Sequence, residues 1–167
     1  MSAISDVRIY RAVSPLSRPI ADATHSLSEI SFYVVEAETE CGVVGQGYLL
    51  SFHYSPGAIA GALKDIRSIA AGLAPNETGV LARKAASEHE YFGHEGIQKW
   101  ALAAVNVAMW DCWGRTLGVP VWKLLGTCVS RVPVYGSGGW LSYSVEELLD
   151  EVLGYVKRGF QAVKIKV

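Results

Sequence analysis

The fold class is decided by residues 131–167, which read RVPVYGSGGWLSYSVEELLDEVLGYVKRGFQAVKIKV. This segment predicts a short strand at 132–135, then a helix, then a second strand at 162–167. Ser144 and Glu147 have the spacing of a capping box, which marks the start of the helix. A strand, a helix and a strand in this order form a βαβ unit, so the two strands are expected to be parallel.

The predicted sheet extends beyond this unit. Parallel sheets are found almost only with both faces covered and with more than two strands. Val167 ends a strand that has the character of a central strand, and no turn signal follows it. We therefore expect the chain to be the front portion of a longer protein.

The segment that precedes residue 131 has a different, mixed pattern. Val7 to Val13 alternate like a strand, and two further strands are expected at 28–39 and 43–50. Together they predict a meander of three antiparallel strands. The stretch 14–26 contains Pro15 and Pro19 and has no period, so we expect a long loop there that could act as a lid.

Helices are expected after the meander. Apolar residues recur with the helical period at 59–73 and again at 97–112, and a more polar helix is expected at 78–92. The tryptophans of the long helix predict that it is buried on most sides. Gly118 is placed to end this helix, and Asp111 is expected to pair with Arg115 four residues on. The whole first part is therefore an α+β domain.

Composition excludes several classes of function. The chain has 167 residues, of which 50% are hydrophobic and 19% charged, and 15 Lys and Arg against 16 Asp and Glu give a net charge of −1. No global field recruits nucleic acid or an anionic membrane, and no apolar run reaches the ~18 residues that a membrane span needs. Three scattered cysteines without C-x-x-C spacing favour a reduced, cytoplasmic protein.

The candidate chemistry lies in the last strand. Side chains alternate along a strand, so Lys164 and Lys166 point to one face and three aliphatic residues to the other. One interpretation is an edge strand protected by solvated lysines. The other is a ligand site at the carboxyl end of a parallel sheet. Neighbouring ammonium groups repel each other's protons, so one amine can act as a general base while the other stays cationic.

Three stretches of the chain resemble a known enzyme group. They are AAVNVAMWD at 103–111, with GR, LGVPVW and LLG following up to residue 126; GFQAVKIK at 159–166; and GVVG at 42–45, with YSP at 54–56. In this order they resemble the mandelate racemase and muconate lactonizing enzyme group of the enolase superfamily. The resemblance implies a capping domain at 1–128 and, at 129–167, the start of a modified (β/α) barrel of the TIM type.

The resemblance also implies an activity. Members of the group bind Mg²⁺ and remove the proton α to a carboxylate, so the chain is expected to belong to a dehydratase or racemase of hydroxy acids, such as sugar acids. Lys166 would be the base and Lys164 its cationic partner, which polarises the substrate carboxylate. The metal ligands are expected beyond residue 167.

Further substrate contacts follow from the same resemblance. Ser137 matches a position that contacts substrate in the racemase-like branch, and Tyr54 and the 14–26 loop match capping elements that close over the site. His25, Arg18 and His53 either contact a hydroxylated sugar acid or are solvated loop residues. Tyr54 is equally well explained as a packing aromatic. The group often assembles through its capping domains, so a homo-oligomer is expected.

A noncatalytic function stays open at this point. In that interpretation, the meander and the tryptophan-rich helices form an oligomerisation or interaction module, and the lysine strand is only an edge. Further βα repeats with Asp or Glu at the ends of the third, fourth and fifth strands would favour the enzyme.

Overall fold

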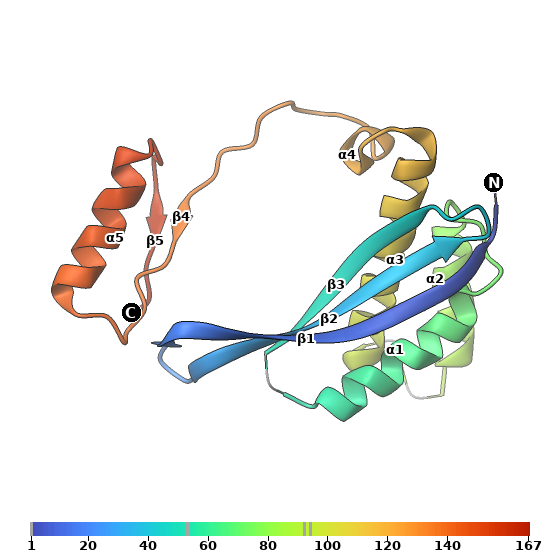
Figure 1. The fold of residues 1–167 in the computed structure, drawn as a ribbon, viewed down its shortest axis with the longest axis horizontal. Helices are drawn as coiled ribbons and strands as arrows, with labels where there is room; N and C mark the ends of the chain where they lie inside the picture. The colour runs from blue at the N-terminus through green and yellow to red at the C-terminus, as the bar shows by residue number, and fades with distance from the viewer. Residues whose placement is uncertain (1, 53, 92, 94) are drawn as a thin grey trace. The chain divides into compact units, whose positions relative to one another are not determined.

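The computed structural model of the chain describes residues 2–52, 54–91, 93 and 95–167. Its first elements are the strands β1 (Ile4–Ala21), β2 (Ser26–Thr39) and β3 (Val44–Phe52), which form one sheet in the order β1-β2-β3 (Figure 1). β2 and β3 are antiparallel, with Val35 opposite Gly47. The predicted antiparallel meander is therefore confirmed.

The expected loop at 14–26 is wrong. β1 and β2 continue through this stretch as paired strands, and only residues 22–25 form the turn between them. Pro15 and Pro19 are tolerated because β1 lies at the edge of the sheet, where a residue without an N–H group removes no ladder bond on the open side. Asp22 Oδ1 closes the turn by accepting from the backbone N–H groups of Thr24 at 2.9 Å and His25 at 2.8 Å.

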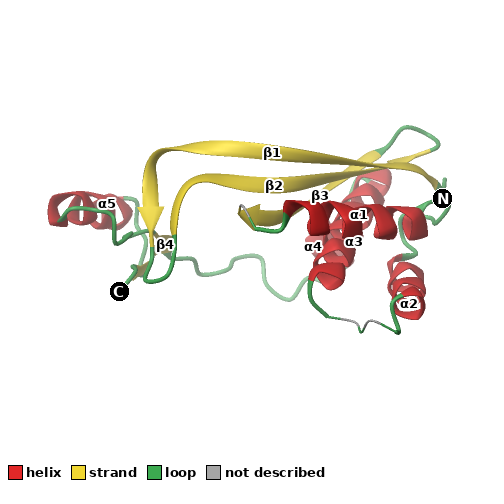
Figure 2. Cartoon of the chain, turned by 90° about the horizontal axis from the view of Figure 1, so that it is seen from below, coloured by secondary structure: helices red, strands yellow, loops and turns green. Residues whose placement is uncertain are grey.

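Four helices follow the sheet: α1 (Pro56–Ala70), α2 (Thr78–Glu88), α3 (Ile97–Leu117) and α4 (Val121–Leu124). Figure 2 shows them on one side of the three strands. α3 packs on β3 and α1 packs on α3. Gly118 ends α3 in the left-handed conformation, with φ of 64°, as the sequence predicts. Among the described residues, no helix is long and apolar enough to cross a bilayer.

The core lies between the sheet and these helices. Alternate residues of β2, from Ser31 to Thr39, are buried on the helical side because successive strand residues face opposite ways. The apolar residues that join this core from the helices share full or nearly full burial: Ile59, Leu63, Ile66, Leu81, Ala101, Val105, Ala108 and Met109.

Two glycines allow α3 to approach β3 at backbone distance. A Cβ atom on Gly45 would lie 2.1 Å from Cys112 N, and one on Gly47 would lie 2.3 Å from Ala104 O. Only glycine fits at such positions, because any side chain would meet the helix backbone. The backbone contact is completed by Asp111, whose Oδ2 accepts from Gln46 N at 2.8 Å.

The long helix is less buried than its sequence predicts. α3 buries one side against the sheet and α1, whereas Trp100 is 57% exposed and Val107 52% exposed. The rings of Trp110 and Trp113 contact each other in a tilted arrangement, with 4.9 Å between their centroids, and both residues are only partly buried. The predicted pairing of Asp111 with Arg115 is confirmed, with 2.7 Å between Oδ2 and Nε.

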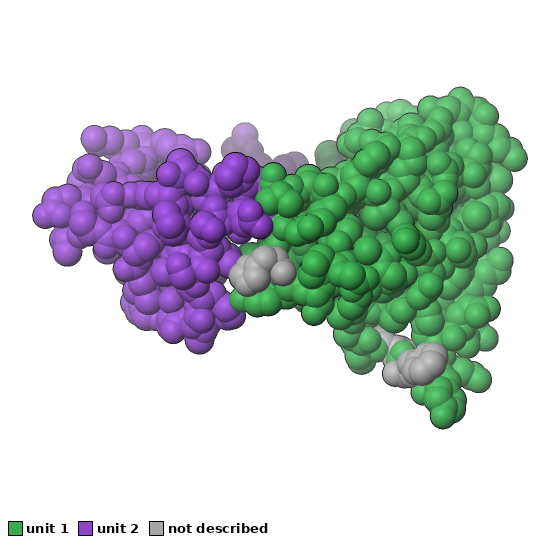
Figure 3. Space-filling view, turned by 60° about the horizontal axis from the view of Figure 1, so that its bottom comes forward, with its two compact units in different colours: residues 1–13, 31–127 green, residues 14–30, 128–167 purple. Residues whose placement is uncertain are grey.

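The chain forms two compact units, residues 1–13 with 31–127 and residues 14–30 with 128–167 (Figure 3). The second unit holds β4 (Gly136–Ser137), α5 (Val145–Lys157) and β5 (Val163–Lys164). β4 and β5 are parallel, which confirms the predicted strand–helix–strand arrangement. The capping box is also confirmed, because Ser144 Oγ accepts from Glu147 N and the Glu147 carboxylate accepts from Ser144 N.

Both strands of this unit differ from the prediction. The strand expected at 132–135 is not formed, and strand pairing begins only at Gly136. The strand expected at 162–167 is paired as β5 only at Val163 and Lys164. Strand character needs a partner as well as a β-rich sequence. None of the α5 residues is fully buried, although the helix is amphipathic in sequence.

Candidate functional site

Three of the predicted site residues meet at the carboxyl ends of the two parallel strands. Ser137 on β4 is the register partner of Lys164 on β5. Side chains of paired residues on parallel strands share a face, and so do residues two apart along one strand. Ser137 and Lys164 therefore lie on one face of this small sheet. Lys166 follows just past the end of β5, and the alternation of the sequence predicts the same face for it. Lys164 is exposed, whereas Lys166 is partly buried.

The hydrogen bonds between the two chain segments continue past β5. Gly138 N donates to Lys164 O at 3.1 Å, and Lys166 N donates to Gly139 O at 2.9 Å. Both lysines are thus tied through their backbone to the glycine loop that follows β4. This arrangement places two amines and one hydroxyl beside a loop whose backbone is already fixed.

Trp140 joins this group. The Lys166 Nζ atom lies 4.9 Å from the centroid of the Trp140 ring, within the range of a cation–π contact. The sequence reasoning did not assign a role to this residue. Its position could have indicated a role, because an aromatic residue immediately after a glycine loop lies close to the residues or ligands that the loop contacts.

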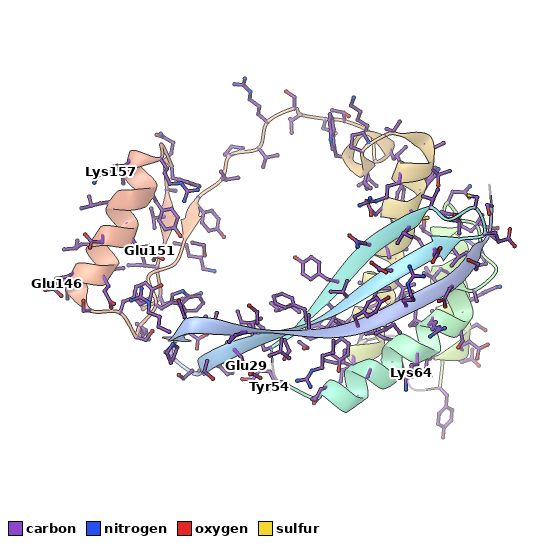
Figure 4. The ribbon with its side chains drawn as sticks, in the orientation of Figure 1. Glu29, Tyr54, Lys64, Glu146, Glu151 and Lys157 are labelled. Carbon is purple, nitrogen blue, oxygen red and sulfur yellow. The ribbon has the colours of Figure 1, made fainter. Side chains whose placement is uncertain are left out.

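α5 supports the glycine loop from beneath. Glu151 Oε2 accepts from Gly139 N at 2.6 Å, and Figure 4 shows Glu151 on the side of α5 that faces the two strands. The Tyr155 hydroxyl donates to Ser137 O at 3.0 Å. A Cβ atom on Gly136 would lie 2.3 Å from the Tyr155 ring, and one on Gly138 would lie 2.1 Å from the Glu151 carboxylate. Because Gly136 and Gly138 have no side chains, α5 can pack directly against the loop.

The tip of the β1–β2 hairpin contacts the same loop, at its other end. Arg18 forms an ion pair with Glu147, and its Cζ atom lies 3.8 Å from the Tyr143 ring centroid. Leu141 N donates to Ala21 O at 2.9 Å, and Ser142 Oγ donates to Pro19 O at 3.1 Å. The residues between β4 and α5 are thus held by the hairpin tip. Arg18, expected in a lid or a solvated loop, is paired.

His25 and Tyr54 lie elsewhere in the chain. His25 occupies the hairpin turn, where its Nδ1 is 2.6 Å from Thr24 Oγ1 and 3.4 Å from Asp22 Oδ1. Tyr54 lies just before α1 in the other unit, with its ring 6.5 Å from that of Phe52 in an edge contact. Their substrate contacts stay predictions, and His53 lies outside the described residues.

Electrostatics at the hairpin turn favour a charged carboxylate. The backbone N–H groups of Thr24 and His25 lower the pKa of Asp22 to about 2. Within the described ranges, no group of three or more His, Cys, Asp or Glu residues is arranged to hold a metal ion.

The N-terminal part of the chain matches a family profile. Residues 4–126 match the profile described as "Mandelate racemase / muconate lactonizing enzyme, N-terminal domain".

Curated relatives match over nearly the whole chain. The 3,6-anhydro-alpha-L-galactonate cycloisomerase of Streptomyces coelicolor is 30% identical over 95% of this chain and 44% of its own length. The L-talarate/galactarate dehydratase of Salmonella typhimurium is 27% identical over 96% of this chain and 42% of its own. The chain thus spans less than half the length of these relatives.

Solved structures agree in fold. The crystal structure of the Salmonella dehydratase, liganded with Mg and L-lyxarohydroxamate, superposes with a TM-score of 0.89 at 26% identity, over 98% of this chain and 44% of that one. The L-talarate dehydratase from Polaromonas, complexed with Mg and L-glucarate, has a TM-score of 0.88 at 28% identity, over 100% and 47%.

Proposed function

Because the chain belongs to the mandelate racemase and muconate lactonizing enzyme family, we propose that it forms the N-terminal part of an enzyme that abstracts the proton α to a carboxylate. In this proposal, residues 1–128 are the capping domain and residues 129–167 begin the barrel. The substrate is a hydroxy acid, most simply a sugar acid, and the reaction is a dehydration or a racemisation. The related dehydratases crystallised with sugar-acid ligands support this choice of substrate.

The observation that carries the proposal is the register pairing of Ser137 with Lys164 at the carboxyl ends of parallel strands, with Lys166 two residues further on. In (β/α) barrels this end of the strands carries the active site. A carbon acid next to a carboxylate is weak, so its ionisation needs a positioned base and a cation that stabilises the enediolate. The lysine pair offers an amine for the first role and a fixed positive charge for the second.

We assign the roles as follows. Lys166 takes the α-proton through Nζ, on one face of the substrate. Lys164 stays cationic and binds the substrate carboxylate. Ser137 donates a hydrogen bond to the substrate from the neighbouring strand.

The same proposal includes Mg²⁺, which two related dehydratases carry in their crystal structures. Bound Mg²⁺ would supply further positive charge to the carboxylate as electron density moves onto it. Hard cations of this kind prefer carboxylate oxygens. We place the ligands beyond residue 167, since the cationic residues at the site on this chain do not suit a metal.

Proton exchange tests the function directly. The full-length protein is incubated in deuterated water with Mg²⁺ and a panel of sugar acids, and loss or exchange of the α-hydrogen is followed by ¹H NMR. Lys166→Ala is expected to abolish the exchange, because it removes the base. Lys157→Ala, an exposed lysine of α5 in the same unit, is the matched control and keeps the wild-type rate. The absence of exchange with every acid would reject the proposal.

We also propose that the protein acts as a homo-oligomer. Exposed Trp100 and Val107 of α3 line one surface hollow together with Tyr48 and Leu50 of β3. Exposed apolar patches of this kind mark interaction surfaces. Light scattering of the eluting protein measures the mass, and Trp100→Lys is expected to lower it. A monomeric wild-type protein would contradict this proposal, and an oligomer without exchange activity would favour the noncatalytic module.

A further inference from the structure

We infer that Trp140 is a positioning residue for Lys166, a role that rests on the proposed function of Lys166 as the base. The ring centroid lies 4.9 Å from the Lys166 Nζ atom. An ammonium group within about 6 Å of an aromatic face is attracted by the negative face of the ring. The four-carbon stem of lysine is otherwise free to rotate. The ring therefore favours one position for the protonated side chain, which is the form that Lys166 has once it has taken the α-proton.

The ring can act in this way because its own backbone is fixed on both sides. On one side, Gly139 O accepts from Lys166 N at 2.9 Å and Gly139 N donates to Glu151 Oε2 at 2.6 Å. On the other side, Leu141 N donates to Ala21 O at 2.9 Å. Trp140 O accepts from Tyr143 N at 3.0 Å, which closes a turn after the tryptophan. Ring and lysine thus belong to one hydrogen-bonded frame.

The approach of the loop to the end of β5 is tight. Gly139 has φ of +61°, and a Cβ atom there would lie 2.6 Å from the Ile165 side chain. A side chain at this position would push the loop, and Trp140 with it, away from Ile165, the residue before Lys166. Gly139 therefore contributes to the same arrangement, because it allows the close approach that sets the distance between the Trp140 ring and the Lys166 Nζ atom.

Trp140 also distinguishes the two lysines. They are two residues apart, yet the ring contacts Lys166, whereas Lys164 is exposed and pairs through its backbone with Ser137 and Gly138. A general base must lie within hydrogen-bond reach of the proton that it abstracts. The contact of the ring with Lys166 therefore separates the base from the residue that binds the carboxylate.

The test compares Trp140→Leu with Trp140→Phe in the full-length protein. Exchange of the α-hydrogen in deuterated water gives kcat and KM, and the melting temperature shows that each variant is folded. Because an error of about 1 Å in position can cost about 10²-fold in rate, Trp140→Leu is expected to lower kcat by roughly 10- to 100-fold. KM stays within about threefold, since Lys164 still binds the carboxylate. Trp140→Phe restores most of kcat because it keeps an aromatic face.

Trp122→Leu is the matched control. Trp122 is half exposed, and the Nζ atom of Lys123 lies 5.4 Å from the centroid of its ring. This variant removes a similar contact outside the proposed site and leaves kcat unchanged.

A second readout does not depend on activity. The lysines are labelled by reductive ¹³C-methylation, and the Lys166 signal, assigned with Lys166→Arg, is expected to be shifted upfield by the Trp140 ring. Trp140→Leu removes this shift and Trp140→Phe keeps part of it. This inference alone is overturned if Trp140→Leu leaves kcat unchanged, or if the Lys166 signal of the wild-type protein is not shifted. If the wild-type protein exchanges the α-hydrogen of none of the acids but its Lys166 signal is shifted, the proposed function is overturned, while the contact between Trp140 and Lys166 is supported.

Discussion

Gly45 is a position where one added methyl group would meet the backbone of a neighbouring helix. In Gly45→Ala the new Cβ atom would lie 2.1 Å from Cys112 N and 2.3 Å from Ala108 O, against about 3.4 Å for an ordinary contact. Both partners are backbone atoms of α3, so no change of rotamer relieves the overlap. α3 must move from β3 by about 1.3 Å, and the hydrogen bond of 2.8 Å from Gln46 N to Asp111 is stretched with it.

The magnitude follows from the rigidity of the two elements. Adding a methyl group to a packed core costs about 1–3 kcal/mol, and a backbone clash belongs at the upper end, near 3 kcal/mol. In a chain of this size 1 kcal/mol corresponds to about 2–4 °C, so Gly45→Ala is expected to lower the melting temperature by roughly 6–12 °C.

The assay is thermal unfolding followed by far-UV circular dichroism. Gly61→Ala in α1 is the matched control, because a Cβ atom there meets nothing within 4 Å. Alanine is the better helix former by roughly 0.5–1 kcal/mol, so this variant melts higher than the wild type. By the same conversion, a change of about 2 °C or less corresponds to less than about 1 kcal/mol. If Gly45→Ala melts this close to the wild type, the close approach of the β3 and α3 backbones does not require glycine at position 45.

Two further predictions concern the second unit. Asp22 has its pKa lowered to about 2 by the N–H groups of the hairpin turn, against about 3.9 in an unfolded chain. Its stabilising effect is therefore complete above about pH 4 and is lost as the pH falls through about 2; a ¹³C NMR titration with a carboxyl midpoint near 3.9 would contradict the turn geometry. Ser144→Ala removes the cap of α5 and is expected to lower the stability of this helix by about 1 kcal/mol. The loss is measured as faster amide hydrogen exchange in the first turn, whereas Ser144→Thr keeps most of the protection. Equal exchange in both variants would show that the cap is not formed.

The parts of the fold that were predicted correctly are those with local signals. The capping box at Ser144 and the glycine end of α3 at Gly118 were both confirmed, because a helix end is specified by residues a few positions apart. The stretch 14–26 was predicted wrongly, because its prolines suggest a loop when the sequence is considered alone. β2 supplies a partner for this stretch, and the edge position of β1 removes the penalty for proline.

The candidate site divides in the same way. Alternation along the last predicted strand is the ground for the prediction that Lys164 and Lys166 share a face, and family likeness pointed to Ser137, which the structure pairs in register with Lys164. The contact of Trp140 with Lys166 and the docking of Arg18 on Glu147 and Tyr143 could not be read from any local pattern.

The sequence by itself determined the order of strands and helices, the end of α3 at Gly118 and the start of α5 at Ser144. These depend on dihedral preferences and periodicity within a single segment. Only the tertiary structure decided that β1 extends to residue 21, that the hairpin tip holds the loop after β4, and that Trp140 takes one lysine and not the other. Such contacts join segments that are distant in the chain, so they depend on strand register and backbone approach, which no local pattern encodes.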